Sequence, residues 1–433
     1  MKIGFISPPA PGHFNPMSAV ACELQSRKYD VVMVSLPMME PLARAANLPF
    51  VSFGEKEFSA EKGAEMIETL SRLKGEEALQ FGLNGLGRLS AIKWKTLPGV
   101  LSANGIDALV LDNYDFYGEL IPMHLGMSYA VLSDALHFDY SGYTPLCIYG
   151  WPHENTPEAR ERNLQGVSKF TEMLIHSHAE IIARAEQAGI KANWEDPSSL
   201  FSDLPWITQC PREFDFESSY WPQQFHHAGP FHDGKGRMEV PFPWDHLTGE
   251  PIVYASMGTV QTGNADIFQI IAASVSKHKG LQLVLSIGNI LNAEEIGRVP
   301  SNAIVVNHAP QLELLKRASV CITHAGLNTV LEALTQGVPQ IAIPVTHDQP
   351  GVAARIANKK TGKTTSLDGL NPSDLLRLLD EVLHNSIYRD NSRAIQQAIT
   401  KKNGLCVAAD LLEQAFGLTN KNDASVPRSQ ICI

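Results

Sequence analysis

Short apolar, β-branched runs alternate with helical patterns along most of this chain, and this alternation constrains its fold more than any other feature. The first half contains the runs KIGFIS (2–7), DVVMVSL (30–36), DALVLD (107–112) and SYAVLS (128–133). The second half contains IVYASM (252–257), LQLVLS (281–286), AIVVN (303–307), SVCIT (319–323) and QIAIP (340–344). Continuous apolar strands separated by amphipathic helices are typical of parallel sheets covered by helices on both faces. The sequence therefore predicts an α/β protein with two doubly wound sheets.

A stretch rich in Gly and Pro, residues 229–251, separates the two series of strands and suits an interdomain connector. The predicted segments are an N-terminal domain (1–235), a linker (236–250), a C-terminal domain (251–403), a helix packing back toward the N-terminal domain (404–420) and a loose polar tail (421–433).

Composition narrows the class of protein. A content of 44% hydrophobic and 19% charged residues indicates a globular chain, and a net charge of −11 argues against nucleic acid or anionic membranes as partners. The six cysteines show no Cys-x-x-Cys and read as reduced packing residues. No apolar run approaches the ~18 residues of a membrane span, and no signal peptide is recognisable at the start. We therefore expect a cytoplasmic protein without a membrane anchor; its oligomeric state stays open.

The strand at 319–323 runs directly into His324, Gly326 and a helical pattern that Gly337 ends. A helix that starts at a tight turn leaves backbone N–H groups without partners, and at the carboxyl edge of a parallel sheet such groups bind anions, above all phosphate. The alternative is that His324 and Asn328 only cap the helix.

Two neighbouring features extend this site. Glu332 lies one helical turn after Asn328, where its carboxylate could accept hydrogen bonds from a ribose. The strand at 340–344 ends in Thr346-His347-Asp348-Gln349, which offers acceptors and amides for sugar hydroxyls.

These residues match a known family. The motifs HAPQ (308–311), THAGLNT (323–329), Glu332, GVP (337–339) and DQ (348–349) resemble the donor-binding box of the UDP-glycosyltransferases, in wording closest to the bacterial zeaxanthin glucosyltransferase branch. The resemblance also covers PPAPGHFNP (8–16) and the GPF connector (229–231).

The resemblance implies a GT-B fold, in which two Rossmann-like domains face each other across a cleft and the C-terminal one holds UDP-glucose as donor substrate, with no further cofactor. By this resemblance, His324, Gly326, Asn328 and Thr329 surround the diphosphate, Ser256 and Thr259 reach the phosphates, Glu332 binds the ribose, His308 and Gln311 lie near the uracil, and Asp348 and Gln349 hold the sugar. Where plant relatives carry Trp, this chain has His308 and Leu327.

Sugar transfer to a hydroxyl needs a base, and His13 is the candidate. It follows the strand at 2–7, with Asn15 as expected N-cap and Pro16 as first helical residue. The helix start is expected to keep the imidazole neutral and thus basic. Taken alone, a histidine at this place is more often a structural or surface residue than a base.

A carboxylate that orients the histidine would complete a catalytic pair. Asp112 ends the strand at 107–112 on the same sheet edge and matches the family's histidine partner, and Asp115 is the reserve candidate.

The sequence predicts metal-independent transfer with inversion. It contains no Asp-x-Asp, and the histidine pairs at 226–227 and 176/178 read as solvated residues rather than metal ligands.

The acceptor is predicted from an aromatic and Met-rich segment, residues 113–147, with Phe14 beside His13. It would form an apolar cleft for a hydroxylated lipophile such as a flavonoid, phenol, carotenoid or xenobiotic, although each residue singly could be core. The alternatives are a macrolide-type transferase using another UDP- or dTDP-sugar, a GT-B nucleotide-sugar epimerase, and a non-catalytic nucleotide-sugar binder.

Overall fold

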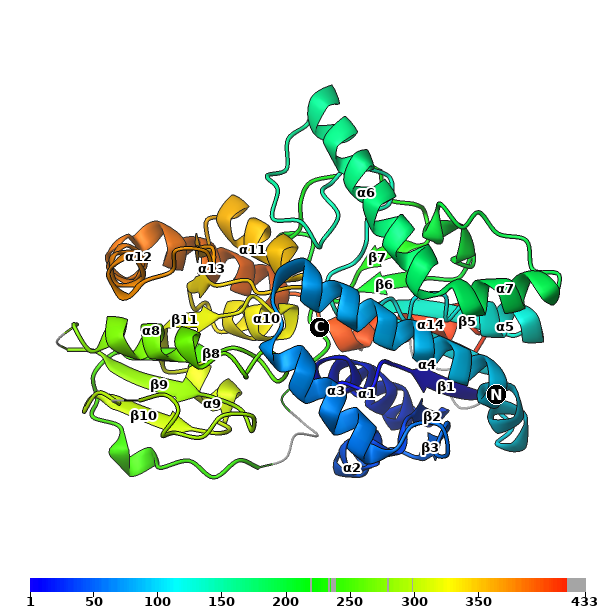
Figure 1. Cartoon of the computed structure of the whole chain (residues 1–433), viewed down its shortest axis with the longest axis horizontal. Coiled ribbons are helices and arrows are strands. Elements are labelled where there is room, and N and C mark those ends of the chain that lie inside the picture. Colours follow the sequence, from blue (N-terminus) through cyan, green and yellow to red (C-terminus); the bar gives the residue numbers. More distant parts are fainter. Residues whose placement is uncertain (219, 233, 235–238, 279, 298, 419–433) are drawn as a thin grey trace, which may run out of the picture.

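The computed structural model describes residues 1–218, 220–232, 234, 239–278, 280–297 and 299–418. These residues form two α/β domains side by side, each built on one parallel sheet (Figure 1). The predicted fold class is confirmed. The predicted tail, 421–433, and the first linker residues, 236–238, lie outside the described residues.

The N-terminal sheet has seven strands in the order β3-β2-β1-β4-β5-β6-β7. Its strands are β1 (Lys2–Ile6), β2 (Asp30–Ser35), β3 (Phe50–Ser52), β4 (Ala108–Asp112), β5 (Ser128–Ser133), β6 (Trp206–Thr208) and β7 (Phe225–His227). Its helices are α1 (Pro11–Ser26), α2 (Glu40–Ala45), α3 (Ala60–Arg72), α4 (Gly75–Ala103), α5 (Leu120–Leu125), α6 (Pro157–Ser177) and α7 (Ala179–Gln187).

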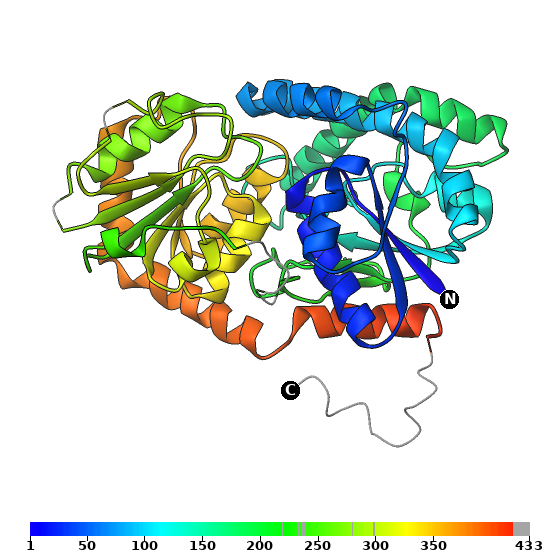
Figure 2. The same cartoon turned by 90° about the horizontal axis from the view of Figure 1, so that it is seen from below.

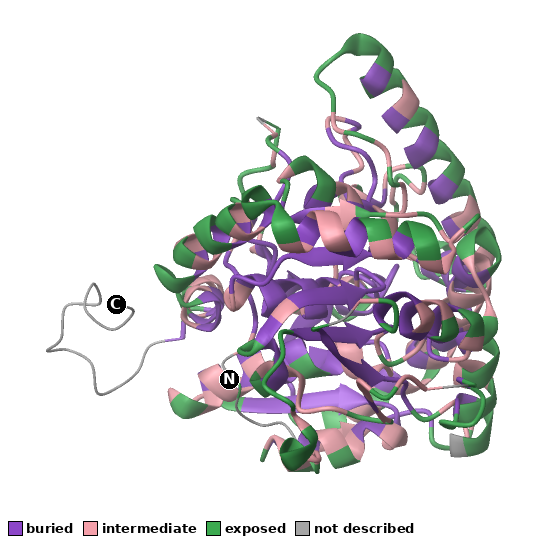
Figure 3. Cartoon of the chain, turned by 90° about the vertical axis from the view of Figure 1, so that its left-hand side faces the viewer, coloured by how far each residue is buried: buried purple, intermediate pink, exposed green. Residues whose placement is uncertain are grey.

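Most strands of this sheet are buried, although β3 is only half-buried. Figure 3 views the molecule from the side of the C-terminal domain and shows buried strands in purple. Because side chains alternate along a strand, Ile3 and Phe5 pack toward α1, whereas Ile6 joins the cluster that contains Leu97 of α4. Each fully buried side chain of this size contributes about 1.5–3 kcal/mol to stability. The helices on both faces are therefore held by the strands' apolar runs.

The C-terminal sheet has six parallel strands in the order β10-β9-β8-β11-β12-β13. They are β8 (Ile252–Ser256), β9 (Gln282–Ser286), β10 (Ala303–Val306), β11 (Ala318–Thr323), β12 (Gln340–Ala342) and β13 (Gly362–Thr364). The helices from there on are α8 (Ala265–Val275), α9 (Gln311–Leu315), α10 (Leu327–Thr335), α11 (Gln349–Asn358), α12 (Pro372–His384), α13 (Ser386–Thr400) and α14 (Gly404–Ala415). None of the helices in the described part of the chain has both the length and the apolar character needed to cross a bilayer.

Helix α14 leaves the C-terminal domain and packs on the N-terminal one. Figure 2 shows it in red beside the dark-blue helix α1. Leu405 and Leu412 share a cluster with Val20 and Leu24 of α1, and Arg27 pairs with Glu413 at 2.9 Å.

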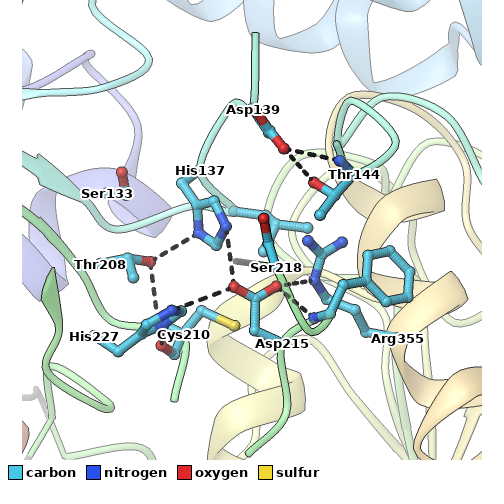
Figure 4. A network of polar contacts seen from close by, with 12 residues as sticks. Ser133, His137, Asp139, Thr144, Thr208, Cys210, Asp215, Ser218, His227 and Arg355 are labelled. Carbon is cyan, nitrogen blue, oxygen red and sulfur yellow. Dashed lines mark hydrogen bonds and ion pairs between the residues drawn. The ribbon is translucent and has the colours of Figure 1, made fainter. Parts of the chain in front are cut away.

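A buried ion pair joins the two domains (Figure 4). Asp215, which follows β6, accepts a hydrogen bond of 2.7 Å from Nε of Arg355 on α11, and both side chains are about 1% exposed. His137 and His227 face the other carboxylate oxygen, at 3.2 and 3.7 Å. The guanidinium also lies 4.2 Å from the ring centre of Phe216. Because both charges are held away from water, breaking this ion pair would cost free energy of folding.

Candidate active site

A cavity of about 920 Å³ lies between the domains. It opens where the strand order of each sheet reverses, between β1 and β4 in one and between β8 and β11 in the other. Open α/β sheets bind ligands at such points. His13 lines this cavity. So does every predicted donor-binding residue: Ser256, Thr259, His308, Gln311, His324, Gly326, Asn328, Thr329, Glu332, Asp348 and Gln349.

His13 lies in the first turn of α1. The helix begins at Pro11 after Ala10, so the expected start at Asn15 and Pro16 is wrong. Pro11 already supplies the fixed φ and the missing N–H that suit a first helical position. Helix α1 therefore starts five residues earlier than expected, at Pro11 instead of Pro16, and Pro16 lies inside it.

Two carboxylates hold the imidazole of His13. Its Nδ1 lies 3.0 Å from Oδ2 of Asp112 and 3.0 Å from Oδ1 of Asp134. Asp115 is paired elsewhere, in a buried ion pair with Lys93 of α4. The structure thus brings His13 and Asp112 together, and it adds a carboxylate that the sequence analysis did not name.

The expectation of a neutral imidazole is not met. Burial lowers the pKa of His13, but the charges and hydrogen bonds of Asp112 and Asp134 raise it more, and its pKa lies well above 6.5. The two carboxylates outweigh the helix terminus because they contact the ring directly.

Pro16 also explains a contact between the domains. Proline has no N–H, so the carbonyl of Gly12, four residues earlier, gains no helical hydrogen bond. That carbonyl accepts a hydrogen bond of 2.6 Å from Nδ2 of Asn328. The turn that carries His13 is thereby tied to the predicted diphosphate site.

The N-terminus of α10 faces the cavity without a side-chain cap. The alternative that His324 and Asn328 merely cap this helix is therefore wrong. The left-handed turn falls on Ala325, with φ of 67°, rather than on Gly326. Burial lowers the pKa of His324 to about 4, so its imidazole is neutral near pH 7 and can donate a hydrogen bond to an anion.

A polar network lies farther along α10. Gln311 donates through Nε2 to Glu332 at 2.6 Å and to Thr329 at 3.2 Å, and its Oε1 accepts from Tyr254 at 2.8 Å. His308 is exposed at the cavity margin. This geometry suits a ribose beside Glu332 and a flat base near His308.

The loop before α11 also meets the N-terminal domain. Oδ2 of Asp348 accepts a hydrogen bond of 2.9 Å from the backbone N–H of Leu136. Oε1 of Gln349 accepts the N–H groups of Val345 and Thr346, which fixes the loop. His347, with φ of 56°, lies between Thr346 and Asp348 in the chain.

Comparisons with known proteins agree with this geometry. The family model described as UDP-glucoronosyl and UDP-glucosyl transferase matches residues 246–401. The uncharacterized UDP-glucosyltransferase YojK of Bacillus subtilis (strain 168) is 34% identical over 419 residues, 96% of each chain. The chain belongs to the UDP-glycosyltransferase family. This confirms the predicted family, and the protein is an enzyme that transfers sugars.

Other similar proteins extend over the same length. The zeaxanthin glucosyltransferase of Pantoea ananas is 26% identical to this glycosyltransferase over 413 residues, 95% of each chain. The crystal structure of CalG4, the calicheamicin glycosyltransferase, has a TM-score of 0.72 at 20% identity and covers 96% of this chain and 98% of its own. The latter shows that the glycosyltransferase has the GT-B fold.

The structure corrects the predicted acceptor wall. Among the aromatic residues and methionines of the segment 113–147, only Tyr114 lines the cavity of the glycosyltransferase. Phe14 is buried in the core. The residues that do not line it are Phe116, Tyr117, Met123, Met127, His137, Phe138 and Tyr140. Helices α3 and α4, with the loop before them, provide the apolar wall instead: Phe58, Met66, Ile67, Leu70, Phe81, Leu86 and Leu89.

Sequence reasoning missed two polar residues of the site. Asp134 directly follows β5, and the rule that selected Asp112 would also have found it. Gln209 follows β6, which is too short to leave a pattern. Its Nε2 donates to the backbone oxygen of Asp134 and to Oδ1 of Asn328, the latter at 2.7 Å.

In each of the two histidine pairs one member differs from the prediction, whereas His176 is exposed, as expected. His178 is buried and its Nδ1 lies 3.1 Å from the oxygen of Leu174, and His227 faces Asp215. They are core groups of the glycosyltransferase rather than solvated ones. His13, Asp112 and Asp134 also have ligand-type atoms within 4.8 Å of one another. Their separations of 3.0 Å are those of hydrogen bonds, and we interpret them as a hydrogen-bonded triad.

Proposed function

We propose that this glycosyltransferase moves glucose from UDP-glucose to a hydroxyl group of a lipophilic small molecule, with inversion and without a metal ion. One observation carries the proposal: the carboxylate-bound His13 and the uncapped start of α10 line the same cavity. A base and an anion site thus face one reaction space.

His13 acts as the general base. Since Nδ1 faces buried carboxylates, the opposite nitrogen, Nε2, is the one directed to the cavity. It takes the proton of the acceptor hydroxyl as the oxygen attacks the anomeric carbon. The bond from that carbon to the diphosphate oxygen breaks, UDP leaves with the electron pair, and attack from the opposite side gives a β-glucoside.

The leaving diphosphate is stabilised by fixed dipoles. Backbone N–H groups at the start of α10 and the N–H of His324 point to it, and they need no reorganisation as its charge develops. Glu332 holds the ribose, and Asp348 and Gln349 hold the glucose hydroxyls. Ser256 and Thr259 complete the phosphate site.

A lipophilic acceptor fits the α3–α4 wall. Met66, Ile67 and Leu70 of α3 line the cavity together with Phe81 and Leu86 of α4, and His13 lines the same cavity. Flexible methionine and aromatic side chains accept apolar bodies of different shape. The similarity to a zeaxanthin glucosyltransferase supports a hydroxylated apolar acceptor.

Product analysis by mass spectrometry tests the proposal. Flavonols, a dihydroxycarotenoid, a macrolide and simple phenols are incubated with UDP-glucose and EDTA, with dTDP-glucose as a competing donor. We expect a gain of one hexose that His13→Ala abolishes, and a β-anomer by NMR. Transfer only from dTDP-glucose, or only with added metal, would contradict the proposal. UDP-glucose converted to another sugar nucleotide without any acceptor would indicate an epimerase.

A further inference from the structure

The ring of His13 faces two carboxylates instead of one. Nδ1 is 3.0 Å from an oxygen of Asp112 and 3.0 Å from an oxygen of Asp134, and both aspartate side chains are fully buried. The His13 side chain itself is 21% exposed. Neither distance makes one carboxylate the sole partner of the ring.

The two carboxylates are held differently. Oδ1 of Asp112 accepts the N–H of Tyr114 at 2.8 Å, which fixes that side chain from the far side. Oδ2 of Asp134 is buried and has no hydrogen-bond partner among the described residues. A buried carboxylate oxygen without a donor costs free energy, so its presence calls for an explanation such as a functional role.

The backbone of Asp134 is tied to the donor side. Its carbonyl accepts from Gln209, and the same amide donates to Asn328 at the start of α10. The placement of Asp134 against His13 is therefore fixed from the C-terminal domain as well as from its own sheet.

We propose that Asp134 is a positioning residue that shares the Nδ1 proton of His13 with Asp112 and sets the pH above which His13 can act as a base. This inference rests on the proposed role of His13. It assigns the two aspartates unequal parts: Asp112 orients the ring, and Asp134 adds charge that stabilises the imidazolium formed during transfer.

The charges around the ring support this assignment. Burial and the charge of Asp112 raise the pKa of Asp134, so the cluster retains a proton where a free imidazole would lose it. The other titratable groups facing His13 are Tyr114, Asp348 and His347. Burial, and then the charge of His13, lowers the pKa of His347 to about 4, so it is neutral near pH 7.

The sign of the pH effect follows. His13 is a base only when neutral, so activity should rise with pH through a midpoint above 6.5, the ordinary value for histidine. Removing the charge of Asp134 lowers that midpoint by about one pH unit or more. The variant should therefore keep a larger share of its maximal rate at pH 6 than the wild type, although its maximal rate falls.

Asp134→Asn is the test and Asp139→Asn is its control. Asp139 lies on the same loop and is also buried, but its carboxylate accepts hydrogen bonds from the backbone N–H groups of Ser141 and Thr144 and is not paired with His13. Two quantities are measured for each protein: the pH profile of kcat/KM, and the His13 midpoint by NMR of histidine labelled at Cε1. The His13 signal, one of 15 histidines, is assigned by its loss in His13→Gln. In Asp134→Asn we expect a lower midpoint than in the wild type, both in the pH profile of kcat/KM and in the NMR titration of His13. In Asp139→Asn both midpoints should equal those of the wild type.

An unchanged His13 midpoint in Asp134→Asn would overturn the inference, whatever the activity. A wild type whose His13 midpoint lies above 6.5 by NMR, as expected, but that transfers no sugar would instead reject the proposed function. The effect of Asp134 on the His13 midpoint could still be measured in that case. If Asp134→Asn does not fold, a wild-type His13 midpoint at or below 6.5 would still reject it.

Discussion

At the scale of single residues, the ring of His324 lies between two glycines. A Cβ atom added at Gly326 or at Gly258 would come within 2.5 Å of that ring. Gly326 has φ of −63°, a conformation open to any residue, so only the space beside the histidine requires glycine there.

Gly326→Ala should therefore displace His324 without straining the backbone. We expect UDP affinity to fall at least about tenfold, ~1.4 kcal/mol, because the imidazole no longer faces the diphosphate. Isothermal titration calorimetry with UDP measures it. Gly99→Ala on α4, where an added Cβ meets nothing within 4 Å, is the control and should leave UDP affinity unchanged. Equal affinity for both variants would show that the position of His324 does not matter for UDP.

The residues at strand ends explain what the sequence could predict. His13 comes after β1 and Asp112 ends β4, and both strands have five residues with a strong apolar pattern, so the sequence predicts that both side chains lie at the sheet edge. The contact of Nδ1 of His13 with two carboxylates could not be predicted from the sequence, because it depends on the side-chain geometry at the ends of β4 and β5 together. The link from Pro16 through Gly12 to Asn328 likewise needs the second domain in place.

At the scale of elements, α3 and α4 meet at a corner that docks on the C-terminal domain. The N–H of Gly75 donates to the carbonyl of Val345 at 2.9 Å, and Asn264 donates to the carbonyl of Ser71 at 3.0 Å. The apolar side of α3 is thereby held over the cavity.

Leu70→Ala should weaken acceptor binding by about 1–2 kcal/mol and raise the acceptor KM roughly five- to thirtyfold, because apolar contact area is lost. UDP affinity should stay, since the donor residues are untouched. Steady-state kinetics with the best acceptor measures this. Thr69→Ala, on the exposed side of the same helix, is the control. A change in UDP affinity without a change in acceptor KM would contradict the assignment of this wall.

All nine strands expected from the sequence are present. In the described part of the chain four more occur that the sequence analysis missed, β3, β6, β7 and β13, each of three residues. Such strands are too short to show a period, and neighbouring strands select them. The acceptor wall was missed for a related reason. An aromatic segment has the same composition whether it lines a cavity or fills a core, and here Phe116 and Phe138 pack against Phe170 of α6.

At the scale of the whole molecule, the pair of Asp215 and Arg355 fixes one domain against the other. Arg355→Met should cost about 3–5 kcal/mol of unfolding free energy, because it leaves a buried carboxylate without its main partner. The double variant Asp215→Asn, Arg355→Met should recover part of that loss. Urea unfolding followed by fluorescence measures both.

The matched control is Arg184→Met, which removes an exposed ion pair with Glu180 on α7. It should cost less than about 1 kcal/mol. Equal costs at the two arginines would mean that the buried pair does not hold the domains together.

The packing of α14 on α1 has a consequence for synthesis. A ribosome releases Pro11–Ser26 early, yet the apolar partners of this helix on α14 emerge only after the whole second domain has been made. The domain that carries His13 therefore cannot complete its outer layer as a nascent chain. Translation order and assembly order differ, and the helix that carries His13 reaches its final packing only when the second domain already exists.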